Sequence, residues 1–211
     1  MALLDLNPVK GRERLTAARD LLSPIISKKL RNEEARKANN LYHEVVENLT
    51  RAMRVTNVSP ELYFDMSLLK NGAQATDISL FEDTIGVVDT QGKTAYTLGV
   101  TSKNGTVVGG GESFVAASHI AAYGDKLYVW TPQGIHQIRL SDKKTVAAII
   151  QPSSEWGTIA DMAAFGGNLY LLDTAKILIL KYVATEKGFS KLLEYLNPDT
   201  LPDLSHTTNI V

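Results

Sequence analysis

Cysteine is absent from the 211 residues of this chain. Its absence excludes disulfide scaffolds, thiolate zinc sites and cysteine nucleophiles. Long apolar runs are also absent, since none approaches the ~18 residues of a membrane span, and the N-terminus, Met1–Asp5, lacks the basic start and apolar stretch of a signal peptide. The formal net charge of −1 provides no basic footprint, so we expect no nucleic-acid partner.

The most informative pattern is a repeat. Three apolar segments begin 42 residues apart, at Asp77, His119 and Asp161, and each is followed by a turn and a second apolar run. A period in the low forties built from short strands is typical of β-propeller blades. We predict blades over 75–111, 117–151 and 159–196, and a stub reaching 211. The predicted strands of the first two blades are 77–81, 84–90, 94–100, 104–110, 119–123, 126–131, 134–140 and 144–150.

Residues 1–58 carry apolar side chains at spacings of three and four, which predicts a helical hairpin. Residues 59–74 join it to the blades, and their alternation over Phe64–Leu69 predicts a strand. This strand falls one repeat before the outer strand of the first blade, so we expect it to clasp the last blade of a closed ring. The predicted fold class is therefore α + mainly β: a helical hairpin followed by an incomplete β-propeller of about three blades, each of four antiparallel strands.

A ring of blades typically needs four to eight members to hide its sheet edges. Three blades and the stub at Asn209–Val211 do not close such a ring. We therefore expect the chain to be a fragment of a larger protein, with the remaining blades supplied by missing C-terminal sequence. We also expect residues 75–211 on their own to self-associate through unpaired edges.

The segments Tyr123–Val129 and Phe165–Asp173 pair a Gly-Asp or Gly-Gly turn with a Leu-Tyr strand. They resemble the repeats of NHL-like and related six-bladed β-propellers, and the likeness covers residues 75–196. The helical lead-in followed by such blades also resembles uncharacterised bacterial proteins, some of which carry a PP2C-like phosphatase domain and a membrane anchor. This second resemblance implies an extracytoplasmic location, with any tether on sequence not present here.

Asp77, His119 and Asp161 share one repeat position, just before the innermost strand of each blade. Propeller geometry places them around one mouth of the central channel, where two carboxylates and an imidazole can bind a divalent metal. Polar residues at strand starts more often hydrogen-bond neighbouring backbone. We therefore expect no metal and no cofactor, and keep the three residues as weak metal candidates.

The loops of one propeller face supply the candidate contact residues. The loops between second and third strands and those between blades carry Asp89, Gln91, Glu112, Gln133, Glu155, Trp156 and Asp173. Acidic and amide groups beside a tryptophan suit contact with a protein or small ligand. Trp156 also suits a position wedged between blades two and three.

The sequence predicts a non-enzymatic interaction or ligand-sensing module, and no catalytic residue is assigned. The alternative is part of a metal-dependent propeller hydrolase or lactonase. Such activity needs acidic or amide ligands pointing into the channel, whereas the innermost strands offer Ser79, Ala121 and Ala163.

Overall fold

The computed structural model describes residues 8–27, 33–53, 59–196 and 202–211. The chain divides into two compact units, Met1–Glu61 and Leu62–Val211. The division places most of the predicted joint, from Leu62 onward, with the sheets rather than with the helices.

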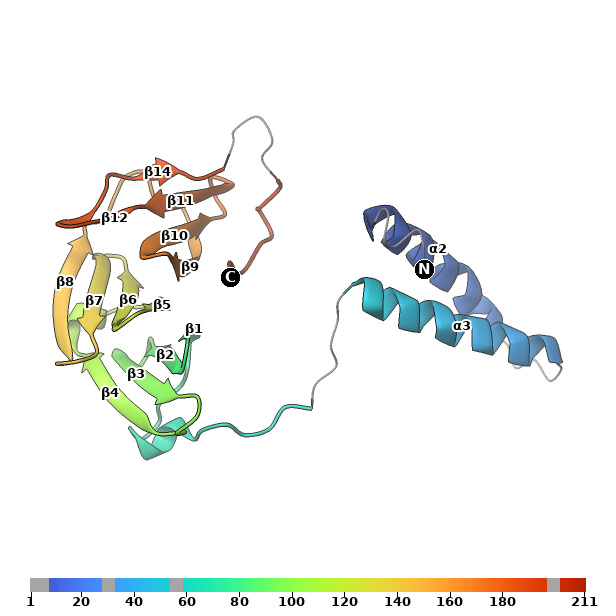
Figure 1. The fold of residues 1–211 in the computed structure, drawn as a ribbon, viewed down its shortest axis with the longest axis horizontal. Helices are drawn as coiled ribbons and strands as arrows, with labels where there is room; N and C mark the ends of the chain where they lie inside the picture. Colours follow the sequence, from blue (N-terminus) through green and yellow to red (C-terminus); the bar gives the residue numbers. More distant parts are fainter. Residues whose placement is uncertain (1–7, 28–32, 54–58, 197–201) are drawn as a thin grey trace. The chain divides into compact units, whose positions relative to one another are not determined.

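The first unit contains two helices that pack against each other, α2 (Pro8–Ile26) and α3 (Glu33–Ala52) (Figure 1). Glu33 and Glu34 occupy the first turn of α3, where the helix dipole favours negative charge. The predicted N-cap of α3, Asn32, lies outside the described residues. None of the described helices is long and apolar enough to cross a bilayer.

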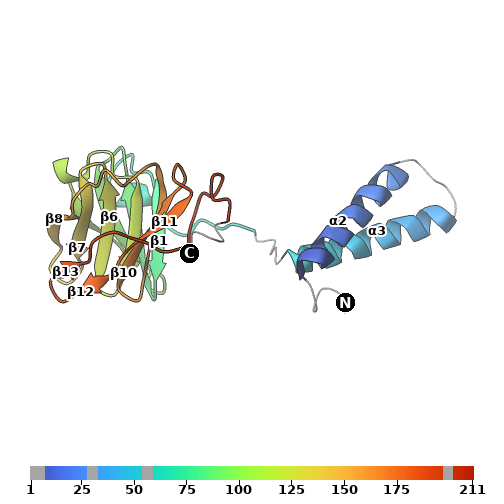
Figure 2. The same cartoon turned by 90° about the horizontal axis from the view of Figure 1, so that it is seen from above.

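The second unit contains three four-stranded antiparallel sheets, as the repeat predicts. Their innermost strands, β1, β5 and β9, are neighbours about a common centre (Figure 1). Seen from above, the strands of the three sheets lie roughly along one axis and alternate in direction (Figure 2). Blade 1 contains β1 (Asp77–Phe81), β2 (Thr84–Asp89), β3 (Thr94–Gly99) and β4 (Gly105–Gly110). Blade 2 contains β5 (His119–Tyr123), β6 (Lys126–Thr131), β7 (Gly134–Arg139) and β8 (Lys144–Ile150).

Blade 3 is less regular than the other two. It contains β9 (Ile159–Phe165), β10 (Asn168–Asp173), β11 (Leu178–Tyr182) and a two-residue outer strand, β14 (Leu193–Glu194). A small hairpin, β12 (Ala184–Thr185) and β13 (Gly188–Phe189), is inserted before the outer strand. Phe189 packs its ring on Tyr128 of blade 2, with 5.8 Å between centroids, so the insertion contributes to the contact between blades.

The core consists of the layers between successive blades. Residues of blades 1 and 2 form one buried cluster, which includes Val88, Leu127 and Ile138, and blades 2 and 3 form a second, which includes Met162 and Leu169. Burial of these apolar faces is the main favourable term that holds the sheets together.

The prediction of a strand over Phe64–Leu69 is wrong. Met66–Leu68 forms a 3-10 helix, because the Asp65 side chain accepts a hydrogen bond from the Ser67 N–H at 2.9 Å and turns the chain. Phe64, Met66 and Leu69 instead pack on a buried cluster of blade 1. A Cβ on Gly105 would lie 2.7 Å from both Phe64 and Leu69, so this glycine allows the segment to lie directly on β4.

His136, on β7, gives the sheet unit a pH dependence. Burial lowers the pKa of the His136 imidazole below its ordinary value. The unfolded chain therefore binds this proton at a higher pH than the folded chain does, and stability decreases as the pH falls through the unfolded pKa of about 6.5. We expect His136→Gln to reduce the loss of thermal midpoint between pH 7.5 and 5.5. An unchanged loss in the variant would show that other groups cause it.

Candidate functional site

The first residue of β1 joins two blades. The Asp77 carboxylate accepts hydrogen bonds from the Ile78 N–H of its own strand and from the Ile120 N–H of β5, both at 2.8 Å. Two residues further along, the Ser79 hydroxyl accepts one from the Ala122 N–H of β5 at 2.9 Å. These bonds satisfy backbone donors at the innermost edge of blade 2, so β1 and β5 are held in register by side chains.

Asp161, on β9, occupies the same repeat position as Asp77 and makes the same pair of contacts. Its carboxylate accepts hydrogen bonds from the Met162 N–H of its own strand and from the Ile210 N–H, both at 2.8 Å. Ile210 therefore contacts blade 3 in the way that Ile120 contacts blade 1. The segment Asn209–Val211, which the sequence suggests as the opening of a first strand, lies beside β9 without strand pairing.

His119 occupies the same repeat position on β5 but bonds differently. Its Nε2 lies 3.1 Å from the Ile159 carbonyl oxygen of β9. A carbonyl oxygen only accepts hydrogen bonds, so this contact assigns the ring hydrogen to Nε2. In the neutral ring, Nδ1 then carries a lone pair, and it lies 4.0 Å from Asp77 Oδ2.

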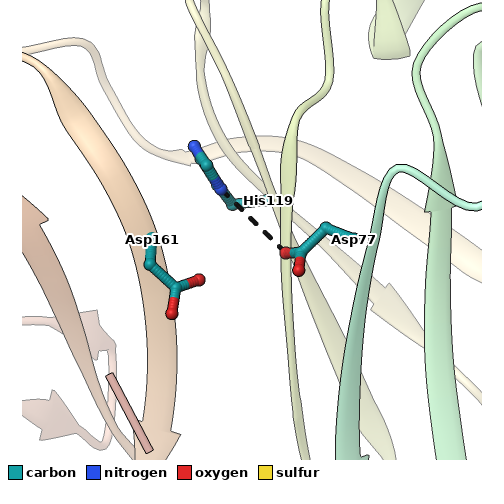
Figure 3. A group of neighbouring side chains, drawn as sticks. All are labelled: Asp77, His119 and Asp161. Atoms are coloured by element: carbon teal, nitrogen blue, oxygen red, sulfur yellow. Dashed lines mark ion pairs between the residues drawn. The ribbon is translucent and has the colours of Figure 1, made fainter. Parts of the chain in front are cut away.

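The three side chains converge (Figure 3). One ligand atom from each of Asp77, His119 and Asp161 lies within 4.8 Å of the other two. Asp161 is 6% exposed, and the side chains of Asp77 and His119 are 17% and 16% exposed. The sequence predicts that the three surround one mouth of the channel, and the structure brings them into a single cluster.

The electrostatics of the cluster reflect its burial. Desolvation raises the pKa of the Asp77 carboxyl, and the nearby Asp161 carboxylate raises it further. The N–H groups of Ile120 and Ile78 and the His119 ring act in the opposite direction. Burial is the largest of these causes, so the net effect is a raised pKa for the Asp77 carboxyl.

A hollow of about 530 Å³ opens beside the cluster. Asp77 and Asp161 line it together with apolar side chains, among them Ile78 and Leu80, each 64% exposed. Of the small inner-strand residues named from the sequence, Ser79 and Ala163 line the hollow, whereas Ala121 is fully buried between blades 2 and 3.

The predicted contact face contains two kinds of residue. Gln91, Glu112, Gln133 and Glu155 are exposed on loops of one face. Glu112 pairs with Lys93 at 2.9 Å, and Glu155 pairs with Lys176 at 3.5 Å. These four side chains are available for contact with a partner.

Asp89 and Asp173 are not available, because they are 1% and 0% exposed. Asp89 accepts hydrogen bonds from the N–H groups of Gln74 and Gly92. Asp173 accepts from Gly157 at 2.6 Å and from Thr158 and Lys176 at 3.1 Å each. Both carboxylates are buried and bond the backbone of neighbouring loops. Asp89 and Asp173 are therefore not part of the candidate contact surface.

Trp156 lies in the layer between blades 2 and 3, partly buried. Its Nε1–H donates to the Tyr182 hydroxyl at 2.9 Å, and its ring lies 6.2 Å from the Trp130 ring. Sequence reasoning missed its repeat equivalent, Phe114, which is fully buried between blades 1 and 2. The available signal was the 42-residue offset between these two aromatic residues.

No family model and no curated protein matches the chain. Its structural neighbours are β-propeller proteins. An auxiliary nutrient binding protein from Bacteroides ovatus ATCC 8483 matches with a TM-score of 0.48 and 12% identity, over 59% of this chain and 32% of that one. The N-terminal domain of Nup159 matches with a TM-score of 0.37 and 13% identity, over 57% and 30%. A chain of the nidogen/laminin complex matches with a TM-score of 0.36 and 12% identity, over 55% and 61%. The chain thus spans less than two thirds of each of these proteins.

Proposed function

We propose that the protein is a non-enzymatic binding module, in which the propeller face around the channel mouth contacts a protein or a small ligand. The observation that carries the proposal is that exposed polar side chains lie on loops whose backbone N–H groups are bonded by buried carboxylates. Gln91 lies on the turn that Asp89 braces through the Gly92 N–H, and Glu155 lies on the loop that Asp173 braces through the Gly157 N–H. A surface held in place before binding loses less conformational entropy when a partner docks.

Charge reversal on this face tests the proposal. We expect the double variant Glu112→Lys/Glu155→Lys to retain a specific partner about tenfold less well than the wild type, because a partner that meets these two carboxylates with positive groups then faces like charges. The measurement is quantitative mass spectrometry of species retained by the immobilised protein from a cell extract.

The matched control is Glu82→Lys/Asp125→Lys, which makes the same charge change on exposed loops at the other ends of the strands. This control should retain partners as the wild type does. Equal retention by all three proteins, or equal loss in both variants, would show that the Glu112–Glu155 face is not the contact surface.

A metal-dependent hydrolase or lactonase is the second candidate, and the convergence of Asp77, His119 and Asp161 favours it. Hydrolysis of ester or lactone substrates that requires added metal and is lost in Asp161→Asn would replace the binding module as the assigned function. The two candidates therefore make opposite predictions for the same purified protein.

A further inference from the structure

The cluster of Asp77, His119 and Asp161 has one cationic group of its own, the His119 ring, which is charged only when it is protonated. No lysine or arginine in the described ranges 8–27, 33–53, 59–196 and 202–211 forms an ion pair with either carboxylate. The His119 ring directs the lone pair of Nδ1, not a hydrogen, at Asp77 when Nε2–H donates to Ile159. With a neutral ring, two carboxylates and a lone pair within 4.8 Å of one another are mutually unfavourable, and either a bound proton or a bound cation relieves the repulsion.

The groups around the cluster fix its ligands in the manner of a metal site. Metal-binding histidines commonly donate their second ring N–H to a carbonyl or carboxylate, as His119 does to Ile159. Each carboxylate is oriented by two backbone N–H groups, one from its own strand and one from a neighbouring segment. These hydrogen bonds orient the two carboxylates but add no positive charge to the cluster.

An ion can also reach the cluster. The hollow of about 530 Å³ is lined by Asp77 and Asp161 but not by His119, so an ion approaches the cluster from the side of the two aspartates. The hollow leaves room for water molecules to complete the coordination of an ion held by three protein ligands.

We propose that Asp77, His119 and Asp161 bind a divalent first-row transition-metal ion, of which Zn²⁺ is the best fit. An imidazole ligand with two carboxylates suits Zn²⁺ or Mn²⁺, whereas Ca²⁺ and Mg²⁺ prefer oxygen ligands alone. Because the three ligands lie on β1, β5 and β9, the ion joins the innermost strands of all three blades. This role does not depend on what the exposed loops bind.

The test uses the full chain, freed of metal with a chelator and dialysed. Isothermal titration with Zn²⁺ should give saturable binding of one ion per chain. A hundredfold excess over the dissociation constant should raise the thermal midpoint of the sheet unit by about 5 °C. Co²⁺ bound at the same site should show visible absorption bands, which report coordination directly and do not depend on activity.

Asp161→Asn and His119→Gln should each abolish the midpoint shift and the Co²⁺ bands. Asp125→Asn and His206→Gln are the matched controls, because these two residues are exposed and lie outside the cluster, and both should bind as the wild type does. The proposal is overturned if no 1:1 binding is seen, if the cluster variants bind as well as the controls, or if only Ca²⁺ shifts the midpoint.

Discussion

Replacing Asp173 by alanine is expected to destabilise the sheet unit by about 3 kcal/mol. The Asp173 side chain is fully buried and accepts hydrogen bonds from the N–H groups of Gly157, Thr158 and Lys176. Alanine leaves these donors without a partner, and hydrogen bonds to a charged group contribute more than neutral ones. Urea unfolding followed by tryptophan fluorescence measures the loss, since both tryptophans, Trp130 and Trp156, lie in the sheet unit.

Asp142→Ala is the matched control for this prediction. Asp142 also accepts a backbone hydrogen bond, from Lys144 at 3.1 Å, and pairs with Arg139, but its side chain is 48% exposed. Water replaces these contacts in the variant, so the expected cost is below about 1 kcal/mol. If Asp173→Ala and Asp142→Ala cost the same, the buried carboxylate does not brace the loop and the rigid-face argument loses its basis.

The sheet architecture could be predicted from the sequence because each blade repeats the same local signals. Turn residues such as Gly124 and Asp125 bound short apolar strands, and the two strands they join pair as an antiparallel hairpin. The irregular part of blade 3 could not be predicted in this way. Its outer strand is only two residues long, and the β12–β13 hairpin interrupts the 42-residue pattern.

Phe64–Leu69 shows where periodicity is ambiguous. Alternating apolar residues suit a strand, but they equally suit a turn that directs Phe64, Met66 and Leu69 at one surface. The hydrogen bond from the Ser67 N–H to the Asp65 side chain favours the turn over the strand. The predicted clasp required this segment to be a strand, and the 3-10 helix that packs on blade 1 removes that basis.

The candidate site was predicted in position but not in geometry. The repeat places Asp77, His119 and Asp161 at equivalent strand starts, yet their approach to within 4.8 Å depends on the packing between blades. The same limit applies to Asp89 and Asp173. An acidic residue in a turn is exposed in most proteins, and only the three-dimensional structure shows that backbone N–H groups surround these two.

Phe114→Ala is expected to destabilise the sheet unit by about 3–5 kcal/mol. The Phe114 ring is fully buried between blades 1 and 2, packs edge-on against His136 at 5.8 Å, and covers Gly109, where a Cβ would lie 2.9 Å from the ring. Truncation opens a cavity in the layer that joins two blades, and the surrounding strands are fixed by their ladders and collapse only partly. The free energy of unfolding is measured by the same tryptophan fluorescence.

Two variants separate the role of Phe114 between blades 1 and 2 from a general loss of aromatic surface. Phe114→Leu keeps most of the buried volume and should cost less than about 1.5 kcal/mol. Phe165→Ala makes the same truncation at a side chain that is 76% exposed, so it should change stability by less than about 0.5 kcal/mol. If Phe114→Ala were no more costly than Phe165→Ala, blades 1 and 2 would not depend on this residue for their contact. A stabilising role for Trp156 in the contact between blades 2 and 3 would then not follow by analogy, although the two residues are matched by the repeat.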